Sequence, residues 1–257
     1  MNIYVDNKDY LNKANIYAQM TGCILTEGTP DLNAGVPCLW LKEEGLTLVG
    51  ESGQMTGDFT KMIPRLKKNN LLGEMVVKAA KIKDKDMPYL IDATAGMGED
   101  SLLLAAAGFK VKLFEYNPVI AALLYDTVER SKDIPELADA VSRMEVVNGD
   151  SIEYLSSFEG ISVSSDRNAG IDIPDVVLLD PMFPERQKSG LIKKKFQLLQ
   201  KLEQPCSNEK ELLDAAIIAH PHKIVIKRPA KGPYLDGRKP SYSMDGKAIR
   251  YDCIVLT

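Results

Sequence analysis

Four acidic residues follow short apolar segments, in the pattern of carboxylates placed at the ends of strands. They are Asp92, Glu115, Asp150 and Asp180. The run 176–179 before Asp180 is continuously apolar and lies between two prolines, which is typical of a strand buried on both faces of a parallel sheet. Because open α/β sheets bind ligands at the carboxyl ends of their strands, we expect the four carboxylates to surround one ligand.

The last of these strands runs into the tetrapeptide DPMF, which begins at Asp180 and includes Pro181 and Phe183. A carboxylate, a proline carbonyl and an aromatic ring at the edge of a sheet could grip a planar group that carries an amine. Asp and Pro are also common where a strand turns into a loop. The tetrapeptide therefore indicates an amine site only together with the rest of the chain.

A glycine turn, DATAGMGED, follows the first of these strands, with Gly96 and Gly98 in the turn. Glu115 comes about 20 residues later, which is the spacing of an acid that binds the ribose hydroxyls of a nucleoside. NAD would meet both requirements. However, the turn is not GxGxxG, and Glu99 and Asp100 place negative charge where a pyrophosphate would bind. An acidic pocket suits the cationic S-adenosylmethionine, which we expect as the cofactor.

Helix capping is the structural alternative for these acids. It would explain Asp100 and Asp150, each of which comes at the predicted start of a helix. It explains Glu115 less easily, because Asn117 is the better N-cap, with Pro118 as the first helical residue. Glu115 is therefore the strongest single indication of a nucleoside site.

From about residue 88 the chain alternates between strand and helix patterns, which predicts a Rossmann-like α/β fold with a mostly parallel sheet. A hairpin signal at Asp245 and Gly246 predicts two antiparallel strands at the C-terminus. The expected strands are 89–91, 111–114, 145–147, 176–179, 224–227, 241–244 and 248–256. The expected helices are 100–107, 118–130, one from about 151, 187–202 and 209–219, with a loop at 161–173.

Residues 1–60 have a different pattern, with a strand at 3–5, a helix at about 10–20 and a hairpin at 39–49. We expect them to form a small α/β cap on a methyltransferase-like domain of residues 61–257. A helix within 61–82 is expected to join the two.

Composition narrows the class of protein. The chain has 257 residues, 45% of them hydrophobic and 26% charged, and no apolar run approaches the length of a membrane span. The N-terminus lacks the pattern of a secretory signal, so we expect a cytoplasmic protein with no membrane partner. Four scattered cysteines and two histidines predict no metal site.

The net charge of −4 argues against a uniformly basic surface, but basic residues gather in three runs. Such runs are usually solvated faces. If they converge on one mouth, they would bind the phosphates of RNA. The candidate RNA contacts are Arg65, Lys67, Arg186, Lys188, Lys193, Lys194, Lys195, Lys227 and Arg228.

With these motifs in order, the chain resembles the class I S-adenosylmethionine-dependent methyltransferases, and more narrowly the RsmJ family of 16S ribosomal RNA guanine-N2 methyltransferases. The motifs are DATAGMGED, FEYNPVIAALL, DPMFPERQKS followed by LIKKK, and KIVIKRP, and they cover residues 55 to the end. The resemblance implies a substrate in the small ribosomal subunit. For a guanine amine we expect catalysis by Asp180 and Pro181, which would accept its N–H bonds, and by Phe183, which would stack on the base. The cofactor contacts that it implies are Glu99, Asp100, Glu115, Tyr116, Asp150, Ser151 and Asp180, beside the Asp92, Gly96 and Gly98 of the strand end and turn.

Other functions remain open at this point. One is an amino-methyltransferase that acts on DNA adenine or on a protein side-chain amide, because Asp or Asn, Pro, any residue and an aromatic recur across such enzymes. The others are a dehydrogenase-like nucleotide-binding protein and a domain that binds RNA without chemistry.

Overall fold

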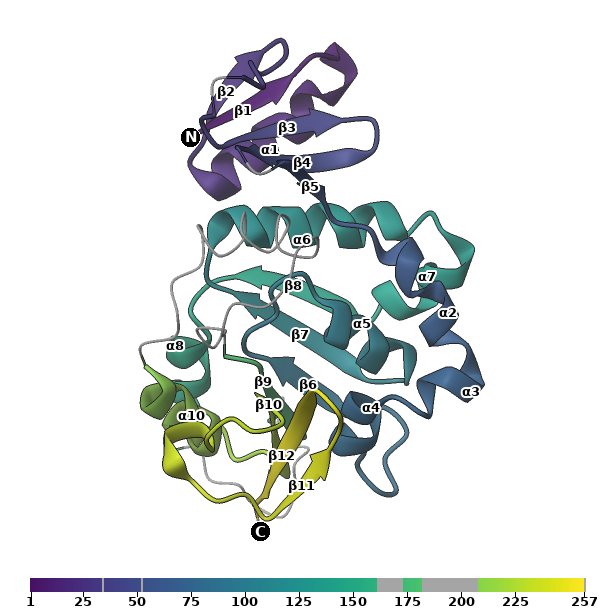
Figure 1. Ribbon diagram of the computed structural model, residues 1–257, viewed down its shortest axis with the longest axis vertical. Helices are drawn as coiled ribbons and strands as arrows, with labels where there is room; N and C mark the ends of the chain where they lie inside the picture. Colours follow the sequence, from purple (N-terminus) through teal and green to yellow (C-terminus); the bar gives the residue numbers. More distant parts are fainter. Residues whose placement is uncertain (34, 52, 161–172, 182–207, 257) are drawn as a thin grey trace.

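The large sheet carries the strand ends of interest. The structure is a computed structural model that describes residues 1–33, 35–51, 53–160, 173–181 and 208–256. The sheet has the order β11-β12-β10-β9-β6-β7-β8 (Figure 1), and the five strands from β10 to β8 in this order run parallel to one another. The parallel strands are β6 (Tyr89–Asp92), β7 (Lys110–Glu115), β8 (Met144–Asn148), β9 (Val176–Leu179) and β10 (Lys223–Pro229).

The last two strands, β11 (Tyr242–Asp245) and β12 (Ile249–Val255), pair antiparallel to each other, and β12 pairs antiparallel to β10. The prediction of an α/β fold with a mostly parallel sheet and an antiparallel C-terminal hairpin is therefore confirmed. The hairpin forms where Asp245 and Gly246 end one strand and begin the turn.

Helices cover both faces of this sheet because successive strand residues point to opposite sides. Leu90 packs in a cluster with α4 (Met75–Ala80), α5 (Glu99–Ala106) and α7 (Pro135–Val141). Its neighbour Ile91 packs in a second cluster with α8 (Ser151–Ser156) and α10 (Glu209–Ile218). All four residues of β9 are buried, as a strand between two helical layers requires.

The long helix α6 (Pro118–Ser131) lies between the large sheet and the N-terminal part of the chain (Figure 1). The Asn117 side chain accepts hydrogen bonds from the amides of Val119 and Ile120, so the predicted N-cap is confirmed. Val119, Ala122 and Leu123 face the N-terminal sheet, whereas Leu124 and Val128 belong to the core of the large sheet. The helix is thus buried on two sides.

The N-terminal part folds as a second sheet of order β2-β1-β3-β4-β5 with α1 (Leu11–Thr21) packed on one face. The strands are β1 (Asn2–Val5), β2 (Ile24–Glu27), β3 (Cys38–Lys42), β4 (Gly45–Gly50) and β5 (Gly53–Thr56). The strand, helix and hairpin expected here are present, and β2 and β5 were not predicted. This sheet ends at Thr56; the domain boundary at residue 60 stays a prediction.

The connection between the two sheets differs from the expected single helix. It consists of η2 (Phe59–Met62), α2 (Ile63–Leu66), α3 (Lys68–Leu71) and α4. Lys67 and Glu74 both have extended backbone, with ψ of 132° and 131°, and each separates two of these short helices. The helix α7, which begins with Pro135 after an extended Ile134, was also not predicted.

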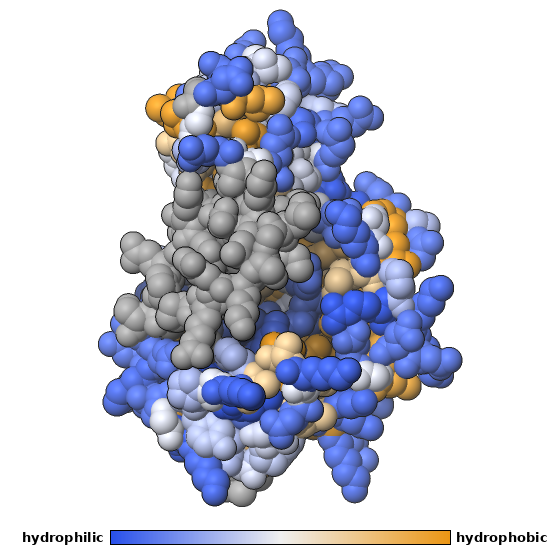
Figure 2. Space-filling view, viewed as in Figure 1, coloured by the Kyte–Doolittle hydropathy of each residue, from blue (hydrophilic) through white to orange (hydrophobic). Residues whose placement is uncertain are grey.

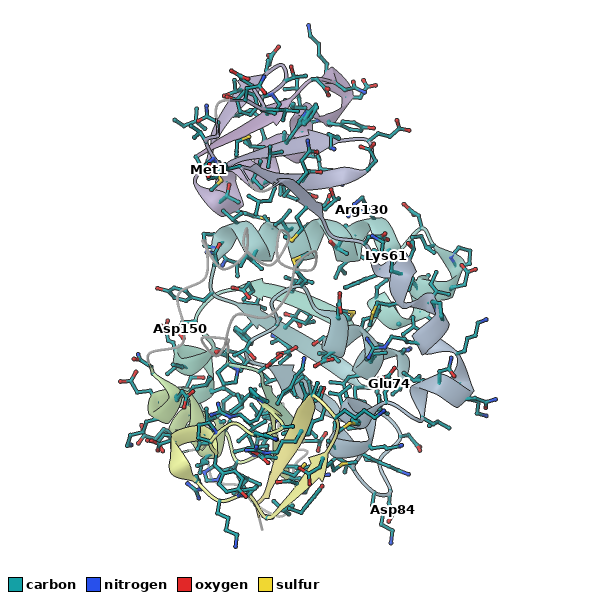
Figure 3. The ribbon with its side chains drawn as sticks, viewed as in Figure 1. Met1, Lys61, Glu74, Asp84, Arg130 and Asp150 are labelled. Carbon is teal, nitrogen blue, oxygen red and sulfur yellow. The ribbon has the colours of Figure 1, made fainter. Side chains whose placement is uncertain are left out.

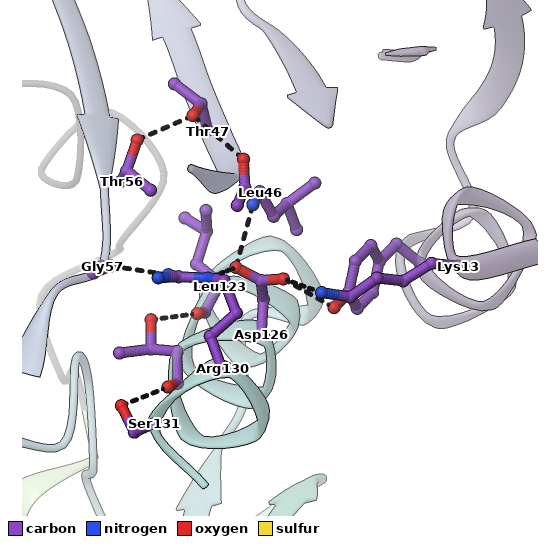
Figure 4. Close-up of polar contacts among 12 residues, drawn as sticks. Lys13, Leu46, Thr47, Thr56, Gly57, Leu123, Asp126, Arg130 and Ser131 are labelled. Carbon is purple, nitrogen blue, oxygen red and sulfur yellow. Dashed lines mark hydrogen bonds and ion pairs between the residues drawn. The ribbon is translucent and has the colours of Figure 1, made fainter. Parts of the chain in front are cut away.

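A buried carboxylate on α6 holds the N-terminal sheet in place (Figure 4). Asp126 is fully buried and accepts hydrogen bonds from the Tyr17 hydroxyl at 2.8 Å and the Leu46 amide at 2.9 Å. Its oxygens also pair with Lys13 Nζ at 2.8 Å and Arg130 Nε at 2.7 Å. Four donors, three of them from the N-terminal part, therefore converge on one carboxylate.

Two glycines permit the close approach of the N-terminal part to α6. A Cβ atom at Gly45 would meet the Arg130 guanidinium, and one at Gly57 would overlap the Thr127 hydroxyl. The Gly57 carbonyl instead accepts a hydrogen bond from Arg130 Nη2 at 2.6 Å. The hydrophobic contacts of α6 and this polar junction fix the two sheets relative to each other.

Figure 2 shows one face, on which hydrophilic side chains prevail and hydrophobic ones gather in small patches. No helix among the described residues is both long and apolar enough to cross a membrane.

Candidate active site

The strand ends meet at the edge of the large sheet from which α6 begins, and Figure 3 labels Asp150 at this edge. Glu115 ends β7 and is 9% exposed. Its Oε2 accepts a hydrogen bond from the Gly96 amide at 3.0 Å, and its Oε1 accepts one from the Asn117 amide at 2.8 Å. Glu115 therefore ties the glycine turn to the end of the neighbouring strand.

The protonation of Glu115 reflects two opposing effects. Burial raises its pKa, and hydrogen bonds from the Asn117, Gly96 and Tyr116 amides oppose that rise. A carboxylate has about four acceptor sites, so these three backbone amides still leave capacity for a hydroxyl of a ligand. This carboxylate is fixed in position and can accept further hydrogen bonds.

Asp92 is buried beside the glycine turn. This residue is 3% exposed, and its oxygens accept hydrogen bonds from the Thr94 amide at 3.1 Å and the Ser101 hydroxyl at 2.6 Å. Burial raises its pKa to about 7. Asp92 supports the glycine turn from within the protein, and a direct contact with the cofactor stays a prediction. The sequence could not separate it from the other strand-end acids, since burial depends on neighbouring elements.

Lys227 lies within the predicted cofactor site. We expected it to contact RNA, but its Nζ lies 2.9 Å from Asp180 Oδ2 and 2.9 Å from Asp100 Oδ2. Tyr251, on β12, donates a hydrogen bond to the same Asp100 oxygen at 3.2 Å. The lysine therefore stands between two carboxylates of the predicted cofactor site, and its role as an RNA contact stays a prediction.

Lys227 and its two carboxylate partners, Asp180 and Asp100, stabilise one another in their charged forms. Burial alone would lower the pKa of Lys227, but Asp180 and Asp100 outweigh it, so the pKa is raised. Burial raises the pKa of Asp180, and Lys227 opposes that rise. The lysine is thus held in its charged form and favours the ionised form of Asp180.

The backbone around Asp180 is also fixed. Its amide donates a hydrogen bond to Thr94 Oγ1 at 2.6 Å, which joins the end of β9 to the glycine turn, and Pro181 is buried. Sequence reasoning missed Thr94 and Tyr251. For Thr94 the signal was its place inside DATAGMGED, whereas no local pattern marked Tyr251.

The remaining cofactor candidates line the same edge. Asp150 caps α8 by accepting a hydrogen bond from the Ile152 amide at 2.8 Å, so the capping alternative holds for one of its oxygens. Asp100 caps no helix, since Gly98 is the N-cap of α5. Ser151 is buried, and the Tyr116 ring is 77% exposed beside Glu115.

Three further basic candidates, Arg65, Lys67 and Arg228, lie within the described residues. Arg65 forms a two-pronged ion pair with Glu74, with N to O distances of 2.7 and 2.8 Å, and Lys67 is exposed. Arg228 is 1% exposed, and its Nε donates to the Pro233 carbonyl at 2.9 Å while Nη1 lies 3.3 Å from Glu209. Its role as an RNA contact stays a prediction, and β10 around it is buried at four of its seven positions.

Several predictions fall outside the described residues. They concern the loop at 161–173, apart from its last residue, the helix at 187–202, and the candidates Phe183, Arg186, Lys188, Lys193, Lys194 and Lys195. Within the described ranges, no group of three or more His, Cys, Asp or Glu side chains could hold a metal ion.

This fold and the carboxylates gathered at its strand ends define a class I S-adenosylmethionine-dependent methyltransferase. The family model for SAM-dependent methyltransferases matches residues 31–256. A crystal structure of a SAM-dependent methyltransferase from Neisseria gonorrhoeae superimposes with a TM-score of 0.74 at 26% identity, over 99% of this chain and 96% of that one.

Within this class, the chain belongs to the ribosomal RNA small subunit methyltransferase J family, as the sequence resemblance indicated. It is 36% identical to the Pseudomonas syringae pv. syringae member over 92% of this chain and 84% of that protein. It is 42% identical to the Pseudomonas paraeruginosa member over 70% of this chain. The latter match spans 65% of the relative's length.

Proposed function

We propose that this protein transfers a methyl group from S-adenosylmethionine to the exocyclic N2 amine of a guanine in 16S ribosomal RNA, in the cytoplasm. The observation that carries the proposal is the ion-paired Asp180 at the end of β9, beside the glycine turn. The names of the relatives support ribosomal RNA of the small subunit as the substrate.

The chain's own residues fit the cofactor. Glu115 offers acceptor capacity for ribose hydroxyls, and the exposed Tyr116 ring offers a surface for the adenine. The Glu99, Asp100, Asp150 and Ser151 positions complete the contacts that the family resemblance implies. When bound, S-adenosylmethionine supplies a methyl group on a sulfonium, whose positive charge suits a pocket rich in carboxylates.

Asp180 and Pro181 supply the means to hold the amine. An exocyclic guanine amine is a weak nucleophile because its lone pair is delocalised into the ring. If the Asp180 carboxylate and the Pro181 carbonyl each accept one N–H bond, they orient the lone pair and favour the positive charge that develops on nitrogen. Phe183 would stack on the base. The amine proton leaves after transfer, to Asp180 or to water.

Lys227 prepares Asp180 for this role. By pairing with the carboxylate at 2.9 Å, it favours the ionised form that accepts N–H bonds and fixes the rotamer of the side chain. Its second contact, to Asp100, links the amine site to the start of α5. Lys227 is a positioning residue in this mechanism, since it acts through Asp180.

The RNA would reach this site only with its target base turned out of the fold. The lysines at 193–195 are proposed to hold the adjoining phosphates, with Lys67 and Lys188 as further contacts and Arg65 and Arg186 beside them. The net charge of the chain is −4, and carboxylates gather at the site, so both would repel RNA phosphates. A local basic surface is therefore needed to bind the RNA.

Single-turnover kinetics of Asp180→Asn at saturating S-adenosylmethionine tests the proposal. The variant keeps the shape and one acceptor oxygen, so it should fold and bind the cofactor, with methyl transfer slower by roughly 10²-fold or more. Asp139→Asn, at an exposed carboxylate on α7, is the matched control. A wild-type rate in Asp180→Asn would contradict the proposed role.

The substrate is tested with tritiated S-adenosylmethionine offered to small ribosomal subunits, bare 16S RNA, DNA and a protein extract in parallel. We expect label in the subunits or the RNA, at guanine N2 after nuclease digestion. Label in DNA adenine or in protein would favour the other amino-methyltransferases instead. Label in none of the four would contradict the enzymatic proposal.

A further inference from the structure

Two side chains from neighbouring strands reach the same oxygen of Asp100. Lys227 on β10 and Tyr251 on β12 lie directly opposite each other in the antiparallel register of these strands (Figure 1). Lys227 Nζ lies 2.9 Å from Asp100 Oδ2, and the Tyr251 hydroxyl donates a hydrogen bond to the same oxygen at 3.2 Å. Because paired residues of two strands share one face of a sheet, this register brings both donors to the first turn of α5, where Asp100 lies.

Tyr251 serves Asp100 alone, whereas Lys227 is shared with Asp180. The Tyr251 ring is buried in the core of the large sheet, and burial together with Asp100 raises the pKa of its hydroxyl, which therefore stays protonated and donates. Asp100 Oδ1 accepts no hydrogen bond from any residue that the structure describes. Tyr251 thus fixes one oxygen of Asp100 and leaves the other available.

The strand order tells which part of the cofactor meets Asp100. Glu115, the proposed ribose contact, ends β7 on one side of β6 and its glycine turn. Asp180, at the proposed site of methyl transfer, follows β9 on the other side. With the ribose at β7 and the methyl group directed to β9, the amino-acid end of S-adenosylmethionine is left for the segment between them. That segment is the glycine turn and the start of α5, which carries Asp100.

From this arrangement we infer that Asp100 Oδ1 binds the α-ammonium group of S-adenosylmethionine and that Tyr251 is a positioning residue for this contact. An ammonium group donates charge-assisted hydrogen bonds to a carboxylate oxygen, and these are stronger than bonds between neutral groups. Tyr251 acts through Asp100, because its hydroxyl holds Oδ2 and so keeps Oδ1 in a fixed place. The inference rests on the proposed role of Asp100 as a cofactor contact, but not on the RNA substrate or on methyl transfer.

The charge of this group suits a further cation. Asp100 and Asp180 are two carboxylates that share the single ammonium group of Lys227. Arg65, another cation near Asp100, is already paired with Glu74. The hydroxyl of a tyrosine adds a donor without adding a positive charge. The group therefore keeps one negative charge more than its lysine balances, and the ammonium group of the cofactor would offset it.

Calorimetry of the full-length protein with two related ligands tests the inference. S-adenosylhomocysteine carries the amino-acid end, whereas 5′-methylthioadenosine has the same adenosine and a thioether without that end. Tyr251→Phe removes only the hydroxyl, so it should weaken binding of S-adenosylhomocysteine about 3- to 10-fold, the range of one hydrogen bond, and leave binding of 5′-methylthioadenosine unchanged. Tyr242→Phe, at a tyrosine of the same hairpin whose hydroxyl bonds to Cys253, is the matched control and should bind both ligands as the wild type does.

A double-mutant cycle shows whether Tyr251 acts through Asp100. Asp100→Asn should weaken binding of S-adenosylhomocysteine by itself, and adding Tyr251→Phe should then have little further effect. Equal weakening of both ligands in Tyr251→Phe, an unchanged or tighter affinity for S-adenosylhomocysteine, or additive effects in the cycle would overturn the inference. RNA methylation takes no part in these measurements, so its failure would count against the proposed function alone.

Discussion

Lys227 and Asp180 face each other across the last paired positions of two neighbouring parallel strands, with Nζ and Oδ2 2.9 Å apart. The strands pair through Ile226 and Leu179, so each charged residue is the next one along its strand. The parallel register therefore creates the ion pair. A shift of one residue in either strand would turn one of the two side chains to the other face.

The first prediction concerns the pH dependence of methyl transfer. Lys227→Met removes the cation that opposes the burial-induced rise in the pKa of Asp180. If the reaction requires ionised Asp180, the acid limb of the single-turnover rate against pH should move to higher pH. Other charged groups near Asp180 are Asp100 on α5, Arg228 on β10 and Asp92 on β6, and they are unchanged in this variant.

Lys227→Arg keeps the charge and should retain most of the wild-type profile, and Lys231→Met, at an exposed lysine beyond β10, should match the wild type. A reduced rate with an unshifted acid limb in Lys227→Met would mean that the lysine has only a structural role.

The second prediction concerns the cofactor. Glu115→Gln replaces a carboxylate by an amide, which loses the charge and places N–H donors where the Gly96 or Asn117 amide now donates. Binding of S-adenosylmethionine, measured by calorimetry, should weaken by about 1–3 kcal/mol. Glu129→Gln, at a partly exposed residue of α6 paired with Lys132, is the control. Equal affinities in the two variants would remove Glu115 from the cofactor site.

The third prediction is a dependence of stability on pH that originates at Asp92. Its folded pKa of about 7 lies above the usual value for an aspartate of about 3.9. A raised pKa contributes stability that is present below about pH 4 and is lost as the pH rises through 7. Asp92→Asn cannot ionise, so its unfolding free energy should rise relative to wild type across this interval.

Urea denaturation at a series of pH values measures this difference. Asp139→Asn provides a control of opposite sign, because Arg143 lowers the pKa of Asp139. The difference between wild type and this variant should stay constant above about pH 4 and change only at acid pH. A constant difference between wild type and Asp92→Asn from about pH 4 to pH 8 would show that Asp92 has an ordinary pKa.

The fourth prediction concerns the lysines at 193–195. Replacing all three by Gln should weaken RNA binding and flatten its salt dependence, by about 0.7 in the log–log slope for each phosphate that the variant no longer neutralises. The affinity for S-adenosylmethionine should stay the same. Exposed Lys78, Lys81 and Lys83, replaced in the same way, form the control. Unchanged affinity at every salt concentration would assign the run to an ordinary solvated surface.

The fifth prediction concerns stability at the junction between the two sheets. Asp126→Asn turns an acceptor into a donor that faces Lys13, Tyr17 and Arg130, so we expect a loss of about 3 kcal/mol in unfolding free energy. Chemical denaturation measures it, with Asp139→Asn as the exposed control. A loss no larger than that of the control would mean that the buried carboxylate adds nothing to stability.

The sequence predicted most of the large sheet because its signals are local. The apolar run 176–179 and the hairpin at Asp245 and Gly246 specify their elements through neighbouring residues. The short helices between Met62 and Lys81 were predicted as one, since helix propensity does not reveal an extended residue such as Lys67. Strand β2 was missed because it lies at the edge of its sheet and is only partly buried.

The sequence predicted the groups of the site that lie at the ends of strands, but not the partners of these groups. Asp180, Glu115 and the glycine turn follow from the rule that carboxyl ends of parallel strands share one edge. The partners of these groups come from distant parts of the chain: Lys227 and Tyr251 meet Asp100 across more than a hundred residues, as the separations of 127 and 151 show. No local pattern distinguishes a lysine that enters such a pocket from one that stays in solvent.

The position of α6 decides what counts as a folding unit in this protein. The helix packs against both sheets, and its Asp126 accepts hydrogen bonds from the N-terminal part. A fragment that begins after residue 60 would expose Val119, Ala122 and Leu123. It would also leave the Asp126 carboxylate without its N-terminal donors. The two sheets are separate in topology, yet they should melt in a single cooperative transition, and limited proteolysis should release neither of them intact.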